Sequence, residues 1–187
     1  MRLLLNSTKL LAVVGSKKSG KTTVVECIIS GLTRKGLLVG SIKHTHHPDF
    51  TIDREGTDTW RHAQAGSRAV SLVGNNEIAL IVKDSSQDRL TYVLDVMMRR
   101  GLDVIVIEGF HSIIARRPDV FKVVTAHDRE DLRQKLHGTV PPILAVSGII
   151  AEKESQVPNV PVPIINSRTD CERLVERIAE GIRGALS

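Results

Sequence analysis

Aromatic residues are scarce in this sequence: phenylalanine, tryptophan and tyrosine together make up 3% of its 187 residues. Proteins that hold single-stranded nucleic acid stack the bases on aromatic rings. A chain with so few rings is a poor candidate for that class, in spite of its formal net charge of +5. We therefore predict no nucleic-acid partner and attribute the surplus of lysine and arginine to phosphate-bearing ligands and to solubility.

Long hydrophobic runs are also missing. No stretch approaches the roughly 20 apolar residues of a membrane helix, and the leucine run at residues 3–5 is too short for a signal peptide. The two cysteines, Cys27 and Cys171, are not spaced as a metal-binding pair. Cys27 falls in a helical pattern, where a small buried apolar residue is the favoured interpretation. These features predict a reduced, cytoplasmic protein that does not bind membranes.

What is present fits an α/β domain. The sequence is 41% hydrophobic and 25% charged, as in a soluble globular protein, and its length suits a single domain over residues 1–187. Apolar runs alternate with helical patterns, which predicts a mostly parallel sheet covered by helices. Strands are expected at residues 10–14, 37–42, 104–107, 120–124 and 143–146. Ser85 with Asp88, and Thr169 with Glu172, are possible capping boxes for two of the helices.

One segment, residues 68–82, interrupts this alternation. Residues 68–73 and 77–82 flank Gly74-Asn75-Asn76, a pattern typical of a β-hairpin, here as an insertion. We expect one face to hold Val70, Leu72, Ile78, Leu80 and Val82, and the other Ala69, Ala79 and Ile81. A ribbon with two partly apolar faces is not stable alone. It is therefore either an extra edge of the main sheet or a dimerisation arm.

The most informative motif is Gly15-Ser16-Lys17-Lys18-Ser19-Gly20-Lys21-Thr22, which fits the P-loop pattern G-x-x-x-x-G-K-[ST]. It lies between the predicted strand 10–14 and a helical pattern, and these flanks disfavour a chance match in a glycine turn. The loop N–H groups and the helix N-terminus converge on phosphates. Lys21 is expected at the β- and γ-phosphates and the Thr22 hydroxyl at Mg²⁺. Further nucleotide contacts are expected from Gly15, Lys17, Lys18, Ser19, Gly20 and Thr23.

Glu108 follows the apolar strand 104–107 directly. A carboxylate at the carboxyl edge of a parallel strand lies where ligands bind in α/β proteins. In P-loop proteins such a residue holds Mg²⁺, directly or through water. We therefore predict Glu108 as a metal ligand with Thr22, the alternative being an ordinary turn residue.

Polar side chains are dense after the second predicted strand, at Lys43, His44, His46, His47, Asp53, Arg61 and His62. The histidines suggest zinc, but structural zinc sites have four ligands, often thiolates, and no cysteine pair is near. A loop that faces the phosphates is favoured over a metal site and over a solvated loop. We predict nucleotide contacts from Lys43 and His44. Asp53 and Arg61 are the candidate catalytic residues, at the terminal phosphate.

Together these motifs resemble the molybdopterin-guanine dinucleotide biosynthesis protein B (MobB) family. The matching pieces are residues 15–22, 43–47 with Phe50 and Asp53, 56–62, 65–66, and 103–110 with its Val-Ile-Glu-Gly-Phe core. The resemblance implies a three-layer P-loop NTPase fold, binding of GTP and Mg²⁺ with weak hydrolysis, and a homodimer built partly on a β-ribbon. It also implies a MobA-like nucleotidyltransferase and molybdopterin-bearing proteins as partners.

The sequence departs from the family pattern after Glu-Gly-Phe, where His111 replaces the usual lysine, and near Gly148, where an aspartate is common. The guanine-binding motif Asn-Lys-x-Asp is absent, and Thr125-Ala126-His127-Asp128 lacks its lysine. Guanine preference therefore depends on the resemblance alone. Two other functions stay open: a P-loop small-molecule kinase, with Asp53 or a histidine activating an acceptor hydroxyl, and a dimeric switch ATPase. The second is weakened because Ser16 stands where that class has a lysine.

Overall fold

The computed structural model describes residues 8–47, 50–83 and 88–184. The leucine run at residues 3–5 and Ser85 of the expected capping box lie outside them. The chain divides into two compact units: Met1–His44 with Met97–Ser187, which we call the sheet unit, and Thr45–Val96, which we call the insertion unit. That residues 1–187 act as one P-loop NTPase domain stays a prediction.

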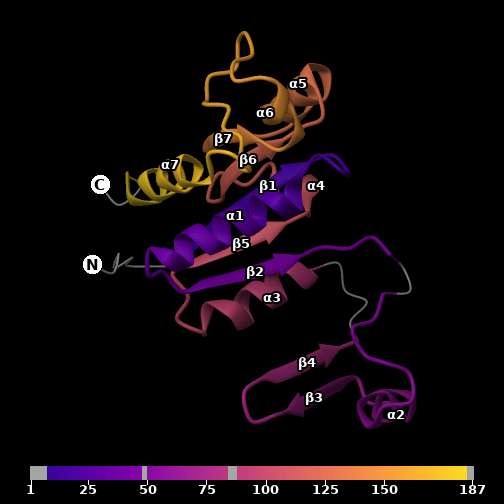
Figure 1. The fold of residues 1–187 in the computed structure, drawn as a ribbon. Coiled ribbons are helices and arrows are strands. Elements are labelled where there is room, and N and C mark those ends of the chain that lie inside the picture. The colour runs from indigo at the N-terminus through magenta and orange to yellow at the C-terminus, as the bar shows by residue number, and fades with distance from the viewer. Residues whose placement is uncertain (1–7, 48–49, 84–87, 185–187) are drawn as a thin grey trace. The chain divides into compact units, whose positions relative to one another are not determined.

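The sheet unit is built on a five-stranded sheet in the order β2-β5-β1-β6-β7, in which every pair is parallel (Figure 1). The strands are β1 (Lys9–Gly15), β2 (Val39–Lys43), β5 (Val104–Glu108), β6 (Phe121–Thr125) and β7 (Ile143–Ser147). β1 and β5 are almost fully buried, as expected for β-branched and leucine-rich strands covered on both faces. The strand predictions and the mostly parallel α/β class are confirmed, with shifts of one or two residues at the strand ends.

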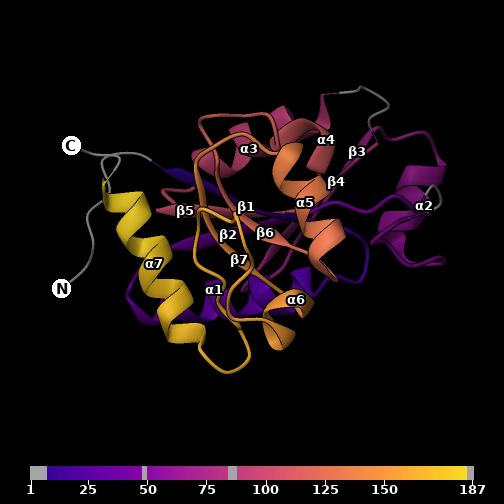
Figure 2. The same cartoon turned by 90° about the horizontal axis from the view of Figure 1, so that it is seen from above.

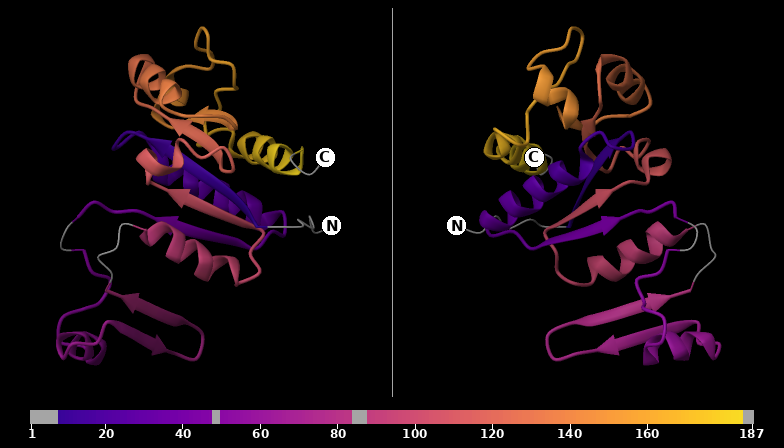
Figure 3. Two further views of the ribbon diagram at one scale, coloured as in Figure 1. Left: turned by 180° about the vertical axis from the view of Figure 1, so that it is seen from behind. Right: turned by 45° about the vertical axis from the view of Figure 1, so that its right-hand side comes forward.

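Helices cover both faces of this sheet (Figure 2, Figure 3). α1 (Lys21–Arg34) and α7 (Cys171–Gly184) pack side by side on one face. α4 (His111–Ile114) and α5 (Arg129–His137) lie on the other, and the short α6 (Ile149–Lys153) follows β7. α1 buries Val24, Val25, Ile28 and Leu32 at helical spacing. They share one hydrophobic core with the buried residues of α7, which are Leu174, Val175, Ile178 and Ile182. α7 begins two residues after Thr169.

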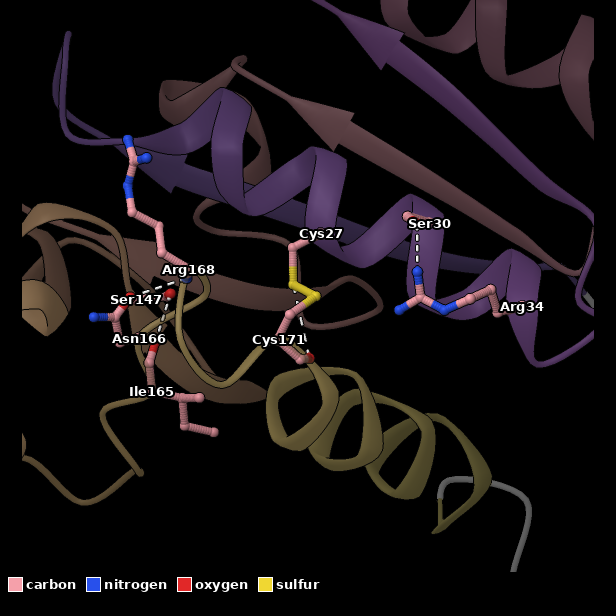
Figure 4. The surroundings of a disulfide bond; sticks show 8 residues. All are labelled: Cys27, Ser30, Arg34, Ser147, Ile165, Asn166, Arg168 and Cys171. Carbon is pink, nitrogen blue, oxygen red and sulfur yellow. Dashed lines mark hydrogen bonds between the residues drawn. A yellow bond between two sulfur atoms is a disulfide. The ribbon is translucent and has the colours of Figure 1, made fainter.

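A disulfide joins Cys27 of α1 to Cys171, the first residue of α7, with the two Cα atoms 5.8 Å apart (Figure 4). The prediction of reduced cysteines, with Cys27 a buried apolar residue, is therefore wrong. No local pattern connects residues 144 apart in sequence. The cysteines meet because the two helices pack closely, and at Gly31 a Cβ would collide with Val175.

The insertion unit contains α2 (Asp58–Gln64) and an antiparallel hairpin of β3 (Ala69–Val73) and β4 (Ile78–Val82), and its boundary falls within α3 (Arg89–Met98). The predicted hairpin is confirmed. The interpretation as an extra edge of the main sheet is wrong, because among the described residues the hairpin forms a two-stranded sheet of its own. The dimerisation arm stays a prediction.

The two faces of the hairpin differ from those expected. Cross-strand partners share a face, and Val70 pairs with Ile81 while Ser71 pairs with Leu80. Residues 74–77 connect the strands, so even positions of β3 oppose odd positions of β4. The prediction that Val70 and Leu72 share a face with Ile78, Leu80 and Val82 is therefore wrong. We call the side of Ala69, Ser71, Val73, Ile78, Leu80 and Val82 the outer face.

Within the described ranges, none of the helices combines the length and the apolar character needed to cross a bilayer.

Candidate functional site

The P-loop is the turn between the end of β1 at Gly15 and the start of α1 at Lys21. Gly20 caps α1 with φ 89, in the left-handed region that favours glycine. A Cβ at Gly15 would collide with the carbonyl and hydroxyl of Thr125 on β6. The first glycine of the motif is therefore needed for a second reason besides the predicted approach of the phosphates: a side chain there would not fit against β6.

Ser19 shapes the loop from inside. Its fully buried hydroxyl hydrogen bonds to Ser16 O at 2.8 Å and to Thr125 Oγ1 at 2.7 Å. Its carbonyl accepts a hydrogen bond from Ile149 N at 3.1 Å. The loop is thus tied both to β6 and to the segment after β7.

Lys21 reaches back over the loop. Its Nζ donates to Gly15 O at 3.2 Å and to Ser16 O at 2.5 Å. Burial lowers the pKa of Lys21; Glu108 opposes this shift, while Lys43 and Lys135 add to it. The Lys21 ammonium group thus lies against the first two residues of the P-loop, in the motif's phosphate-binding position.

Thr22, Lys43 and Glu108 come together at the N-terminus of α1. β5 lies beside β1 and pairs Glu108 with Val13, which brings the carboxylate to this edge. Thr22 Oγ1 donates to Glu108 Oε1 at 3.1 Å, and Lys43, the last residue of β2, forms an ion pair with the same oxygen. Glu108 is only 6% exposed. A hydroxyl and a carboxylate are hard oxygen ligands of the kind Mg²⁺ prefers, so the donor set fits the predicted metal.

His44 lies beside Glu108, and His111 lies near Lys21. The His44 backbone N–H donates to Glu108 O at 2.9 Å, and the His44 ring stacks on Phe110 with centroids 4.2 Å apart. Burial lowers the pKa of His111, and the positive charges of Lys135 and Lys21 act in the same direction. At neutral pH His111 is therefore a mostly uncharged side chain near the P-loop lysine.

The first residues of α5 and the loop before it contribute contacts that sequence analysis missed. Ser16 Oγ donates to Asp131 Oδ1 at 2.6 Å, and the His127 ring nitrogen Nε2 donates to Lys17 O at 2.7 Å. Asp128 caps α5, its Oδ1 accepting from Asp131 N at 2.9 Å. Asp131 lies 115 residues from Ser16 in a strongly polar helix. No spacing or motif in the sequence distinguishes it from a solvated surface residue.

Asp53 and Arg61 belong to the insertion unit, and their predicted position at the terminal phosphate stays a prediction. Asp53 Oδ1 accepts from Thr59 Oγ1 at 2.9 Å and from Thr57 Oγ1 at 3.1 Å. Burial acts to raise the pKa of Asp53, but these hydrogen bonds hold it below its ordinary value. Arg61 pairs with Asp58 at 3.6 Å on an exposed helix face. Both side chains have a local structural partner.

The histidine-rich stretch provides no metal cluster in the part of the chain that the structure describes. No group of three or more histidine, cysteine, aspartate or glutamate side chains there is arranged to hold an ion. His44 contacts Phe110 instead.

Comparisons with known proteins agree on one family, MobB. The family model "Molybdopterin guanine dinucleotide synthesis protein B" (MobB) matches residues 10–141. The chain is 35% identical over 105 residues to the molybdopterin-guanine dinucleotide biosynthesis adapter protein of Haemophilus influenzae, a match covering 56% of this chain and 58% of that protein. It is 32% identical over 126 residues to the Escherichia coli protein of the same name, covering 66% and 71%.

Among solved structures, Bacillus subtilis MobB aligns with a TM-score of 0.70 and 26% identity over 90% of this chain and 97% of that one. The predicted fold class is thereby confirmed. The curated match spans little more than half of the Haemophilus influenzae relative.

Proposed function

Because the chain belongs to the MobB family, we propose that it binds GTP with Mg²⁺ and serves as an adapter in molybdopterin-guanine dinucleotide biosynthesis. In this role it acts beside a MobA-like nucleotidyltransferase and molybdopterin-bearing proteins, in the cytoplasm. The observation that carries the proposal is a complete P-loop whose threonine contacts a buried carboxylate on the neighbouring strand.

In this proposal Lys21 and the backbone N–H groups of the loop bind the phosphates, and Thr22 and Glu108 hold the metal. Mg²⁺, when bound, neutralises charge on the phosphates. Lys43 pairs with the Glu108 carboxylate, the group proposed to hold the metal. If Glu108 held the metal, its carboxylate would no longer be reserved for Lys43, and the Lys43 ammonium would be available to the phosphates.

Hydrolysis is proposed to be weak. Around the P-loop, the hydrogen bonds and ion pairs described above join loop, strand and helix residues, and Asp53 is engaged with Thr57 and Thr59 in its own unit. Asp53 and Arg61 remain the candidates for assisting hydrolysis. The preference for guanine over adenine is proposed from family membership.

The outer face of the hairpin supports a homodimer. Val73, Ile78 and Leu80 are 71%, 66% and 52% exposed, on a ribbon that has no main-sheet partner among the described residues. Exposed apolar side chains gathered on one face indicate an interface. A second copy of the same ribbon is the occupant we propose.

Calorimetric titration of the protein with GTP and with ATP, each with and without Mg²⁺, tests the nucleotide assignment. We expect GTP to bind more tightly than ATP and Mg²⁺ to strengthen the binding. A protein that binds neither nucleotide contradicts the proposal. Tight binding of ATP with phosphorylation of a small acceptor would instead indicate the kinase alternative.

A further inference from the structure

The first half of the P-loop is held from outside by residues of the β6–α5 segment. Asp131 uses both carboxylate oxygens: Oδ1 accepts from Ser16 Oγ at 2.6 Å and Oδ2 accepts from the His127 backbone N–H at 3.0 Å. The His127 ring continues the connection to Lys17 O at 2.7 Å. Because a carbonyl only accepts, the hydrogen of this bond lies on His127 Nε2. Two of the three bonds connect the P-loop to the β6–α5 segment, and the third joins His127 to Asp131 within that segment.

These bonds fix the direction of a backbone that binds ligands through its N–H groups. A P-loop cradles phosphate through successive backbone N–H groups that converge on the ligand. The bond from His127 fixes the Lys17 carbonyl, and with it the planar peptide unit that carries the Lys18 N–H. The bond to Asp131 fixes the Ser16 side chain. Although burial acts to raise the pKa of Asp131, the hydrogen bonds from Ser16 and His127 keep it below its ordinary value, so the acceptor is ionised at neutral pH.

The helix that carries Asp131 is secured independently of the loop. Asp128 caps it, Leu132 is buried at 1% exposure, and Arg129 pairs with Glu154 at 2.7 Å. A helix fixed in this way offers a rigid support for the loop. Loss of the Asp131 carboxylate is therefore expected to free Ser16 without unfolding α5.

We propose that Asp131 and His127 are positioning residues for the phosphate chain: they hold Ser16 and Lys17 in the phosphate-binding conformation before the ligand arrives. This inference depends on the proposed nucleotide function and assigns to it two residues outside the P-loop motif.

The test compares truncating with conservative variants at both positions. Asp131→Ala and His127→Ala remove the bonds to the loop. Asp131→Asn keeps an oxygen for the His127 N–H and offers its amide hydrogens to Ser16 Oγ, and His127→Gln places an amide donor near the position of Nε2. Asp128→Ala is the matched control. It removes the side chain that caps the same helix, and none of the hydrogen bonds described for Asp128 goes to the P-loop.

Two quantities are measured for each variant: the melting temperature and the affinity for inorganic tripolyphosphate and for GTP, by calorimetry. Tripolyphosphate reports on the loop without any contribution from the base. We expect Asp131→Ala and His127→Ala to lower both affinities about three- to tenfold, from the loss of one or two hydrogen bonds. Asp131→Asn, His127→Gln and Asp128→Ala should stay within about twofold of the natural protein.

The outcomes separate this inference from the proposed function. If Lys21→Ala loses tripolyphosphate binding while Asp131→Ala and His127→Ala bind normally, the positioning role is wrong and the nucleotide site stands. If Asp128→Ala weakens binding as much as Asp131→Ala at a similar melting temperature, the effect is general loosening of α5 and the positioning role is again wrong. If Lys21→Ala has no effect, the P-loop function itself fails.

Discussion

The sheet unit and the insertion unit use their side chains in opposite ways. In the sheet unit the polar residues of the site contact one another: Thr22 and Lys43 share one oxygen of Glu108. Thr22 lies at the start of α1 and Glu108 at the end of β5, two elements that bury most of their apolar residues. In the insertion unit most of the large apolar residues of the hairpin are exposed. Asp53 and Arg61 bond there to near neighbours in sequence.

This difference indicates which unit has a site whose residues already contact one another and which unit exposes apolar residues. In the sheet unit helices cover both faces of the sheet (Figure 2), and Thr22, Lys43 and Glu108 already contact one another, so we expect a preformed phosphate site. The hairpin exposes apolar side chains on its outer face, and a second copy of the ribbon is the partner we propose for them. The two units should therefore respond independently: substitutions in one should change phosphate binding, and substitutions in the other should change assembly.

The largest effect is expected from Lys21→Ala. The variant loses a charge-assisted contact of about 1.5–3 kcal/mol, so affinity for the triphosphate should fall roughly ten- to hundredfold. Calorimetry measures the affinity, and light scattering should show an unchanged oligomeric state. Lys153→Ala, an exposed lysine on α6, is the control for a simple change of net charge. Unaltered affinity in Lys21→Ala would refute the site.

The hairpin provides the converse test. Leu80→Asp places a charge on the outer face and should weaken the dimer at least tenfold, because a charge buried without a partner is costly. Leu72→Asp lies on the opposite face, beside the buried Val70, and should have a smaller effect. Sedimentation measures the dimer dissociation constant, and GTP affinity should not change. A natural protein that is monomeric at high concentration would rule out the arm.

A smaller change is expected when Glu108 and Lys43 are varied. Glu108→Gln should weaken Mg²⁺-dependent GTP binding about tenfold and leave Mg²⁺-free binding nearly unchanged, because a neutral amide is a poorer metal ligand. Lys43→Met removes the competing ammonium, so it should lower the Mg²⁺ concentration for half-maximal effect about threefold. Calorimetry at a series of Mg²⁺ concentrations measures both. An equal loss with and without Mg²⁺ in Glu108→Gln would show that Glu108 is not on the metal side.

The smallest effect concerns pH. Burial, with Lys135 and Lys21, lowers the pKa of His111 below its ordinary value of 6.5. The unfolded chain therefore binds more protons than the folded one between the lowered pKa and 6.5, so stability is full above this window and falls as pH drops through it. His111→Gln should flatten this dependence in thermal unfolding measured from pH 7 to pH 5. An unchanged slope would assign it to other groups.

The sequence was sufficient for the parts of the molecule that depend on local pattern. An apolar run predicted β1 and a continuous β-branched run predicted β5. The glycines with Lys21 and Thr22 predicted the loop between a strand and a helix. Glu108 was found because strand ends in a parallel sheet meet at one edge. The neighbour relation of β5 and β1 then brought it to Thr22.

Features that depend on distant packing were not predictable. Asp131 and His127 reach the loop only because β6 lies beside β1, and in sequence they look like an ordinary polar helix start. The disulfide joins helices from opposite ends of the chain. The hairpin faces were misassigned because they depend on the register of the two strands. A shift of one residue moves every side chain of one strand to the opposite face.

The Cys27–Cys171 disulfide also sets the covalent topology of the molecule. It closes residues 27 to 171 into a ring, and the whole insertion unit lies on that ring, while β1 and the P-loop precede it. A single protease cut at the exposed hairpin connection, residues 74–77, opens this ring and leaves two polypeptide fragments linked by the disulfide. β1 then belongs to one fragment and β5 and β6, its neighbours in the sheet, to the other. The phosphate site is thus assembled from both fragments, and a nicked molecule keeps them in one covalent piece until the disulfide is reduced.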